Sequence, residues 1–166
     1  MTTQRSRKLA MTTLAILVTL TVATAGSGNG THSKAYALAA QPQKDAFKTG
    51  EPIILRLSLS NDSADEIYII ETSATKDNQL EIMNGRGEKV AMSERGKRRL
   101  ASPELRRIIS KVGAGQAIQY AINVSDLYDF AGGDTYTVKV KRKILMANKR
   151  TFAEVKSHPV KVSVEL

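Results

Sequence analysis

Residues 123–136 read NVSDLYDFAGGDTY and mark a corner between two β-strands. An alternating apolar stretch ends there, two consecutive glycines allow the chain to reverse, and Tyr136 begins the next alternating stretch. Some β-sandwich domains carry a tyrosine at such a strand start, where the ring packs inward and the hydroxyl group bonds to backbone upstream. We therefore predict that Tyr136 is buried and that its hydroxyl group hydrogen-bonds to the backbone.

The polar residues of the corner are predicted to have a structural role. Either Ser125 or Asp126 is expected to cap a single helical turn over residues 127–129, because side-chain oxygens accept hydrogen bonds from otherwise unpaired N–H groups. Calcium binding by Asp126, Asp129 and Asp134 is the alternative, but their spacing does not match an EF-hand loop. The residues assigned to the structural corner are Asp126, Tyr128, Gly133, Asp134 and Tyr136.

Strands with one apolar face are predicted on both sides of the corner. Residues 53–60, 116–124, 136–141 and 160–166 alternate with period two, which is typical of a sheet covered on one face. The apolar faces are predicted to consist of Ile53, Leu55, Leu57, Leu59, Ile118, Tyr120, Ile122, Val124, Tyr136, Val138, Val140, Val160, Val162, Val164 and Leu166.

Less regular segments connect these strands. An edge strand is expected from residue 35 to 40, another strand within residues 66–72, and a hairpin turn at residues 84–87, where two glycines permit positive φ angles. Residues 93–107 are expected to form a long basic surface connection without a helix. Ile108 and Ile109 are then expected to return to the core as a short strand.

Several short, one-sided strands without a convincing amphipathic helix predict an all-β fold. We expect an immunoglobulin-like antiparallel β-sandwich of about seven to eight strands over residues 35–166, with a closed barrel as the alternative. Branched aliphatic side chains are well suited to fill the space between two packed sheets.

The first 25 residues have the pattern of a secretory signal peptide. Basic residues precede an apolar run over residues 9–22, and Ala23 and Ala25 supply the small side chains that a signal peptidase accepts. Cleavage after Ala25, a flexible leader over residues 26–34, and a secreted or periplasmic location are therefore expected. An uncleaved anchor that holds the protein in the cell envelope is the alternative, because the stretch from Leu9 to Ala25 is at the low end of the spanning range.

The chain expected after cleavage is basic and has no cysteine. The sequence has 25 Lys and Arg against 16 Asp and Glu, and three of the basic residues precede the expected cut, so the mature chain has a formal charge of +6. It contains no cysteine, and the domain must be held together by its core rather than by disulfides.

Short motifs along the chain resemble the small immunoglobulin-like domain that precedes the catalytic domain in deuterolysin-type metallopeptidases. The motifs lie at residues 48–53, 59–61, 125–129 and 133–136, with Gly115 before an alternating strand. The chain is similar, more loosely, to the intracellular proteinase inhibitors of bacilli. These resemblances imply a β-sandwich in a secreted context without an active site, because the peptidases' zinc motif His-Glu-x-x-His and a catalytic domain are absent from the sequence.

The sequence offers little material for catalysis. Its two histidines, His32 and His158, lie in the expected leader and at a turn, where exposed loop positions explain them. A catalytic triad or a histidine-based zinc site would require partners that the sequence does not supply. We expect a non-enzyme without cofactors or bound metal.

Basic residues cluster in two segments, residues 95–111 and 139–150, which together hold 13 of the 22 in the mature chain. If the two segments met in space, they would attract anionic groups by long-range electrostatics, although a solvated basic surface explains them equally well. The candidate residues for binding an anion or a partner are Arg95, Lys97, Arg98, Arg99, Arg106, Arg107, Lys141, Arg142 and Lys143.

These observations predict an interaction module that contacts another protein or an anionic surface. Inhibition or regulation of a peptidase is the alternative, and it rests only on the resemblance. Nucleic acid is not an expected partner, because no reading motif or aromatic platform accompanies the charge. Contact with a membrane is expected only through an uncleaved signal segment.

Overall fold

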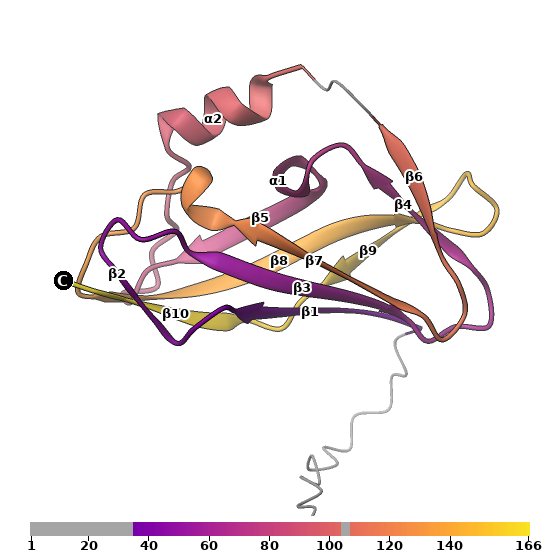
Figure 1. Cartoon of the computed structure of the whole chain (residues 1–166), viewed down its shortest axis with the longest axis horizontal. Coiled ribbons are helices and arrows are strands. Elements are labelled where there is room, and N and C mark those ends of the chain that lie inside the picture. The colour runs from indigo at the N-terminus through magenta and orange to yellow at the C-terminus, as the bar shows by residue number, and fades with distance from the viewer. Residues whose placement is uncertain (1–34, 104–106) are drawn as a thin grey trace, which may run out of the picture. The chain divides into compact units, whose positions relative to one another are not determined.

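The computed structural model describes residues 35–103 and 107–166, and this part of the chain forms two β-sheets packed face to face (Figure 1). The predicted β-sandwich is confirmed, with ten strands in the described residues rather than seven to eight. One sheet has three antiparallel strands in the order β1 (Tyr36–Pro42), β3 (Ile54–Asn61) and β7 (Ala117–Asn123). The expected signal peptide, its cleavage site and the leader lie outside the described residues.

The second sheet has seven strands and is organised around β8 (Asp134–Leu145). Its main path is β2-β10-β8-β4-β6, and β5 and β9 pair with β8 off this path. All pairs in this sheet are antiparallel except β2 with β10. The remaining bounds are β2 (Ala46–Lys48), β4 (Ile67–Glu71), β5 (Asn78–Met83), β6 (Ile108–Val112), β9 (Phe152–Lys156) and β10 (Val160–Glu165).

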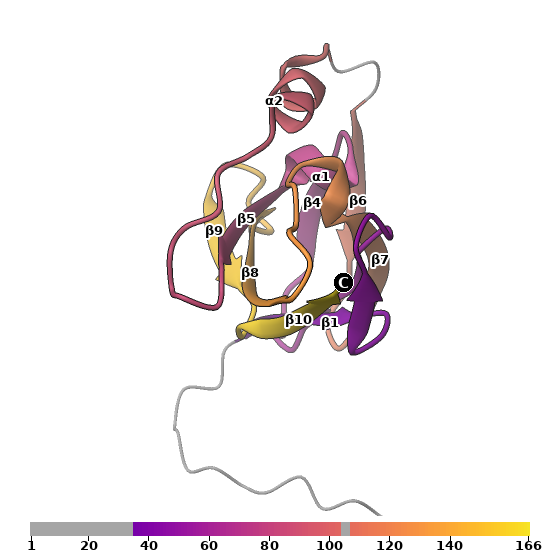
Figure 2. The same cartoon turned by 90° about the vertical axis from the view of Figure 1, so that its left-hand side faces the viewer.

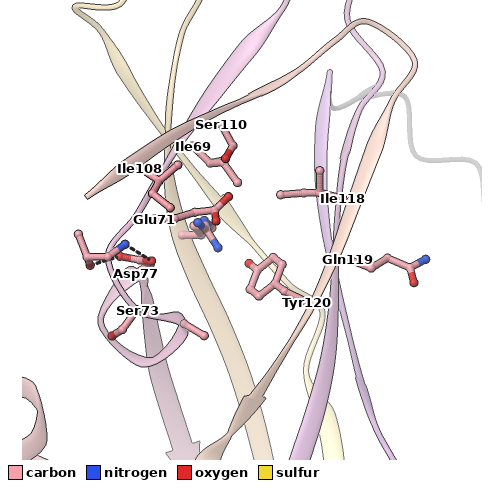
Figure 3. A pocket seen from close by; sticks show the side chains of 12 residues that line it. Ile69, Glu71, Ser73, Asp77, Ile108, Ser110, Ile118, Gln119 and Tyr120 are labelled. Atoms are coloured by element: carbon pink, nitrogen blue, oxygen red, sulfur yellow. Dashed lines mark hydrogen bonds between the residues drawn. The ribbon is translucent and has the colours of Figure 1, made fainter. Parts of the chain in front are cut away.

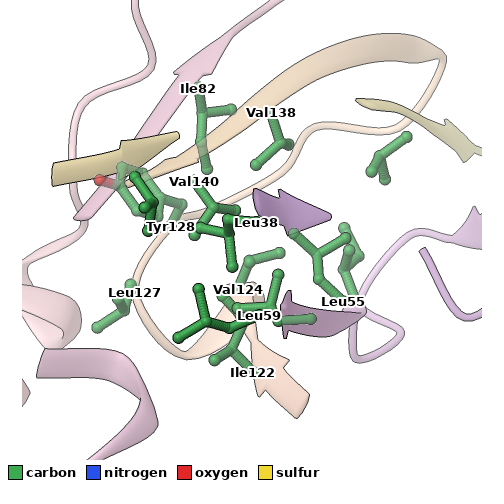
Figure 4. Close-up of a cluster of buried hydrophobic side chains, with 14 of the residues drawn as sticks. Leu38, Leu55, Leu59, Ile82, Ile122, Val124, Leu127, Tyr128, Val138 and Val140 are labelled. Carbon is green, nitrogen blue, oxygen red and sulfur yellow. The ribbon is translucent and has the colours of Figure 1, made fainter. Parts of the chain in front are cut away.

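The core lies between the two sheets, as the alternating patterns predicted. Leu55, Leu57 and Leu59 of β3 are at most 1% exposed and face Val138 and Val140 of β8, which are fully buried. Figure 4 shows side chains from both sheets meeting with those of the corner, including Leu127 and Tyr128. Burial of these branched side chains supplies the main favourable free energy of folding.

The strand β4 separates from β8 after a single paired position, Tyr68 with Leu145. A short helix, α1 (Ala74–Asp77), follows β4, and β5 then pairs with β8 from Asn78 onward. The helix therefore lies in the chain between two strands that border the same strand β8. Two pockets, described below, are lined by residues of β4, α1 and β8 in the region where β4 and β8 separate.

Helix α2 (Glu94–Ala101) corrects the expectation that residues 93–107 contain no helix. Ser93 is its N-cap, and the Ser93 side chain accepts a hydrogen bond from the N–H group of Gly96. The helix exposes most of its residues and lies outside the two sheets in both views (Figure 1, Figure 2). It lacks an apolar stripe, which is why periodicity did not indicate it.

Three apolar residues expected in the core are exposed. Ile108 and Ile109 belong to β6 as predicted, but they are 42% and 59% exposed, because β6 is the last strand of its sheet. Leu166 is 98% exposed, since it follows the end of β10. The hairpin turn at residues 84–87 is present, with Gly87 at φ 78°, but its returning arm forms only an isolated bridge between Met83 and Lys89.

Candidate functional site

The corner is a fold landmark, as predicted. Tyr136 is 3% exposed, its hydroxyl oxygen accepts a hydrogen bond from the Ala131 N–H group at 2.8 Å, and the hydroxyl group donates to the Ala131 carbonyl oxygen at 3.2 Å. The Phe130 ring packs edge-on against the Tyr136 ring with centroids 4.8 Å apart. The prediction of a buried, backbone-bonded Tyr136 is confirmed.

The other corner residues stabilise neighbouring segments. The Tyr128 hydroxyl group donates to the Leu80 carbonyl oxygen, Gly133 adopts φ 75°, and Asp134 Oδ1 accepts from the Gly85 N–H group. Asp126 lies 3.3 Å from Arg99 in an ion pair. The Gly133 N–H group donates to the Val164 carbonyl oxygen, so the residues assigned to the structural corner all have a structural contact.

The helical turn of the corner differs from the expected one. It is the 3-10 helix η1 (Val124–Asp126), and its cap is Asn123, whose side chain accepts a hydrogen bond from the Ser125 N–H group. The Ser125 hydroxyl oxygen instead accepts from the N–H group of Ile53 at 2.9 Å, and so ties the corner to the residue just before β3. The expected cap at Ser125 or Asp126 is therefore wrong.

The basic residues of α2 are largely engaged with their own surroundings. Lys97 pairs with Glu94 at 2.6 Å, Arg99 pairs with Asp126, and Arg95 donates to the Ser125 carbonyl oxygen. Arg98 is exposed on the same helix. Arg106 lies outside the described residues, so its position remains a prediction.

One residue of the first basic segment and three of the second line a common pocket of about 270 Å³, which we call the basic groove. Arg107, from the first segment, lines it together with residues of β8 from the second segment. Lys76 of α1 adds a basic residue that the sequence did not single out. The basic side chains that line the groove are Lys76, Arg107, Lys141, Arg142 and Lys143.

The charge of the groove is predominantly positive. Asp77 and Glu154 are the acidic residues in its lining, and Glu154 is paired with Lys156 at 3.1 Å. Lys141 lies 3.4 Å from Glu81, whereas the Lys76 ammonium group donates to the Ser102 carbonyl oxygen. An excess of positive charge in a concave site attracts anionic groups more strongly than the same charge on a flat surface.

A second pocket, of about 480 Å³, lies between the two sheets beside β6 and β7, and we call it the apolar pocket. Figure 3 shows Ile69 and Ile108 on one side of it and Ile118 and Tyr120 on the other. Its polar residues come mainly from the β4–α1 connection and from β6 and β7. The lining residues that are not aliphatic are Glu71, Thr72, Ser73, Asp77, Ser110, Gln119, Tyr120 and Arg142.

Arg142 lines both pockets and is only 3% exposed. Its Nη2 atom donates to the Ile70 carbonyl oxygen at 3.3 Å, and its guanidinium carbon lies 4.7 Å from the centroid of the Tyr120 ring. Its Nε atom hydrogen-bonds to no described residue. Burial raises the pKa of the Tyr120 hydroxyl group, which donates to Asn78 Oδ1 at 3.0 Å.

The alternation of β8 contains a signal for the position of Arg142. Residues 136, 138 and 140 are apolar and buried, and the same period places position 142 on the inward face. Lys141 and Lys143, by contrast, lie on the outward face. Arg142 therefore differs from its two lysine neighbours in burial, although all three were predicted to belong to one basic cluster.

No helix in residues 35–103 and 107–166 is long and apolar enough to cross a membrane. Within the same residues, no group of three or more histidine, cysteine, aspartate or glutamate side chains is arranged to hold a metal ion.

Comparison with known proteins gives no family assignment. No family model and no curated protein sequence matches the chain. Among solved structures, the chain is similar to the CARDB domain of a Pyrococcus furiosus protein crystallised with di-metal ions, with 9% identity, a TM-score of 0.39, and coverage of 78% of this chain and 86% of that one.

Two further solved structures share the same low level of similarity. The sporulation control protein Spo0M from Bacillus subtilis has 11% identity and a TM-score of 0.41 over 80% of this chain and 50% of its own, so the present chain spans half of Spo0M. The CooA pilin subunit from enterotoxigenic Escherichia coli has 9% identity and a TM-score of 0.28, over 78% and 99% of the two chains. With TM-scores below 0.5, the sandwich is established by its own two sheets and not by these relatives.

Proposed function

We propose that this protein is an exported, non-catalytic binding module that holds an acidic segment of a partner protein in the basic groove. The observation that carries the proposal is that Arg107 from the first basic segment lines one concave site together with Lys76 and the basic residues of β8. Basic residues that only keep a surface soluble would have no reason to gather in this way from distant parts of the chain.

The surroundings of the groove favour a peptide over a flat anionic surface. Ile70 and Phe152 also line it, and Phe152 is 52% exposed. A peptide that alternates acidic and apolar side chains can use both the charges and this exposed ring. A membrane or a polysaccharide sheet would instead contact the most prominent basic residues, which include those of α2.

Fluorescence anisotropy with a fluorescein-labelled oligoglutamate peptide tests the proposal. We expect saturable binding at low salt that weakens as salt is raised, because exposed charges are screened over about 10 Å at 0.1 M ionic strength. Changing Lys76, Arg107 and Lys143 together to glutamate is expected to weaken binding by about tenfold or more, since it turns attraction into repulsion.

The matched control reverses three charges on helix α2, at Lys97, Arg98 and Arg99. This variant has the same net charge as the groove variant, so it should retain most of the peptide binding. A larger loss in the control than in the groove variant would overturn the assignment of the groove. Stronger binding to phosphatidylglycerol vesicles than to the peptide would replace the acidic peptide by an anionic surface as the partner.

A further inference from the structure

We propose that the apolar pocket binds a small molecule with an apolar body and a carboxylate head, and that the carboxylate accepts hydrogen bonds from Arg142. This site differs from the basic groove in its chemistry, because Ile69, Ile108, Ile118 and the Tyr120 ring give it apolar walls on both sides. Arg142 and Asp77 line both pockets. The proposal goes beyond the proposed partner binding and does not depend on it.

Arg142 is the reason to expect an acidic head. A guanidinium group remains charged at every physiological pH, and burial of a charge without a counter-charge is costly. Arg142 forms no ion pair with a described residue, and its Nε–H donor has no described hydrogen-bond partner. The Ile70 carbonyl oxygen and the Tyr120 ring offset only part of this cost.

The two carboxylates in the pocket lining do not take the place of such a ligand. Asp77 is engaged by Thr72, whose N–H and hydroxyl groups donate to it at 2.9 Å and 2.5 Å. Glu71 lines the pocket without forming an ion pair with Arg142. Its negative charge opposes an acidic ligand, so its removal should strengthen binding.

The walls and volume suit the apolar part of the ligand. Ile69 and Ile108 come from one sheet, and Ile118 and the Tyr120 ring come from the other (Figure 3). A volume of about 480 Å³ falls within the range of small-molecule sites. The pocket lies beside the edge strands β6 and β7, which gives a ligand a path between the sheets.

Calorimetric titration of the folded protein with hexanoate, octanoate, decanoate and dodecanoate tests the proposal. We expect affinity to rise about fourfold with each added methylene group until the pocket is filled, because each group is removed from water. Decanol should bind about tenfold more weakly than decanoate, because it lacks the charge-assisted hydrogen bond to the guanidinium group. The Arg142 Nε–H resonance in a nitrogen-15 NMR spectrum should shift with decanoate and not with decanol.

Two variants with matched controls locate the site. Arg142→Met is expected to reduce decanoate affinity by about tenfold, to the level of decanol, whereas Lys139→Met, on the outward face of the same strand, should leave it unchanged. If Arg142→Met fails to fold, Ser110→Phe provides a second test by filling the pocket from β6. Its control is Ile109→Phe, because that residue is 59% exposed.

The substitution Glu71→Gln tests the proposal through an expected gain of affinity rather than a loss. It should raise affinity for decanoate and leave affinity for decanol unchanged. Absence of saturable binding for every carboxylate would overturn the proposal, as would equal affinity for decanoate and decanol. Binding that survives both Arg142→Met and Ser110→Phe would place the ligand elsewhere.

Discussion

The Tyr136 hydroxyl group fixes the loop before β8 through two hydrogen bonds. It accepts one hydrogen bond from the N–H group of Ala131 and donates another to the carbonyl oxygen of the same residue. The bonded segment lies five residues upstream, so the hydroxyl group holds the loop against the start of β8. The ring itself is buried with Phe130 against it.

Replacement of Tyr136 by phenylalanine should therefore destabilise the fold without creating a large cavity. We expect a loss of about 1–2 kcal/mol in the free energy of unfolding, because the Ala131 backbone groups lose their partner. Urea denaturation followed by circular dichroism measures it. Tyr36→Phe is the control, since Tyr36 is partly exposed and its hydroxyl group bonds to no described residue, and an equal loss in both variants would refute the role of the corner.

The place of a single residue could be predicted where the local backbone geometry requires that residue type, but not where a charge suggested exposure. Tyr136 could be predicted because glycines and a strand start surround it. Arg142 could not be separated from Lys141 and Lys143 by composition, although strand periodicity places it inward. Its surroundings come from β5, β9 and the Tyr120 ring of the other sheet, and no short sequence window contains these neighbours.

Among the elements, helix α2 depends on its contact with the corner. The Ser93 N–H and hydroxyl groups both donate to the Leu127 carbonyl oxygen, and Gly96 packs directly over the same residue. A Cβ atom at position 96 would lie 2.3 Å from that carbonyl oxygen. The glycine thus permits the helix backbone to approach the chain at η1.

The substitution Gly96→Ala separates helix propensity from packing. Propensity alone predicts a gain of about 1 kcal/mol, whereas the close approach to the Leu127 backbone predicts a loss of about 1–3 kcal/mol. We expect the loss, measured as a lower midpoint of urea denaturation. Arg98→Ala, at an exposed position of the same helix, should change the stability by no more than about 0.5 kcal/mol. A stabilised Gly96→Ala variant would contradict the packing.

Elements with strict alternation were predictable, and short or polar ones were not. The strands β3, β7, β8 and β10 follow from period two, because one covered face imposes it. Helix α2 exposes most of its residues, and only capping signals indicate it: Ser93 at the N-cap, Glu94 in the first turn and basic residues in the last turn. The strands β2 and β9 form through pairing with β10 and β8, so their own sequences carry little signal.

For the whole molecule, the mass of the recovered chain distinguishes export with cleavage from anchoring. If the signal peptide is cleaved as proposed, protein recovered from the outside of a bacterial inner membrane should begin at Gly26, as mass spectrometry of the intact chain would reveal. Recovery with residues 1–25 attached, in the membrane fraction, would favour the anchored alternative.

Peptidase inhibition rests on the sequence resemblance, and a panel of exported peptidases assayed with excess protein tests it.

The sandwich itself was predictable from patterning, whereas both pockets were not. They form where segments far apart in the sequence meet, such as Arg107 with Lys143 and Ile69 with Ile118. A basic site requires residues of the two basic segments to lie close together, which the sequence alone does not determine. Only the order of strands in the sheets determines which side chains become neighbours.

The parallel pairing of β2 with β10 sets the order in which the fold can be completed. Residues 46–48 pair with residues 163–165, and β10 also pairs with β8. A chain that emerges from its N-terminus cannot close this sheet until β10 has emerged, and contacts of such wide sequence separation slow folding. The strand β2 therefore remains without its partner strand until the C-terminal strand is available, and the edge of this sheet is completed last.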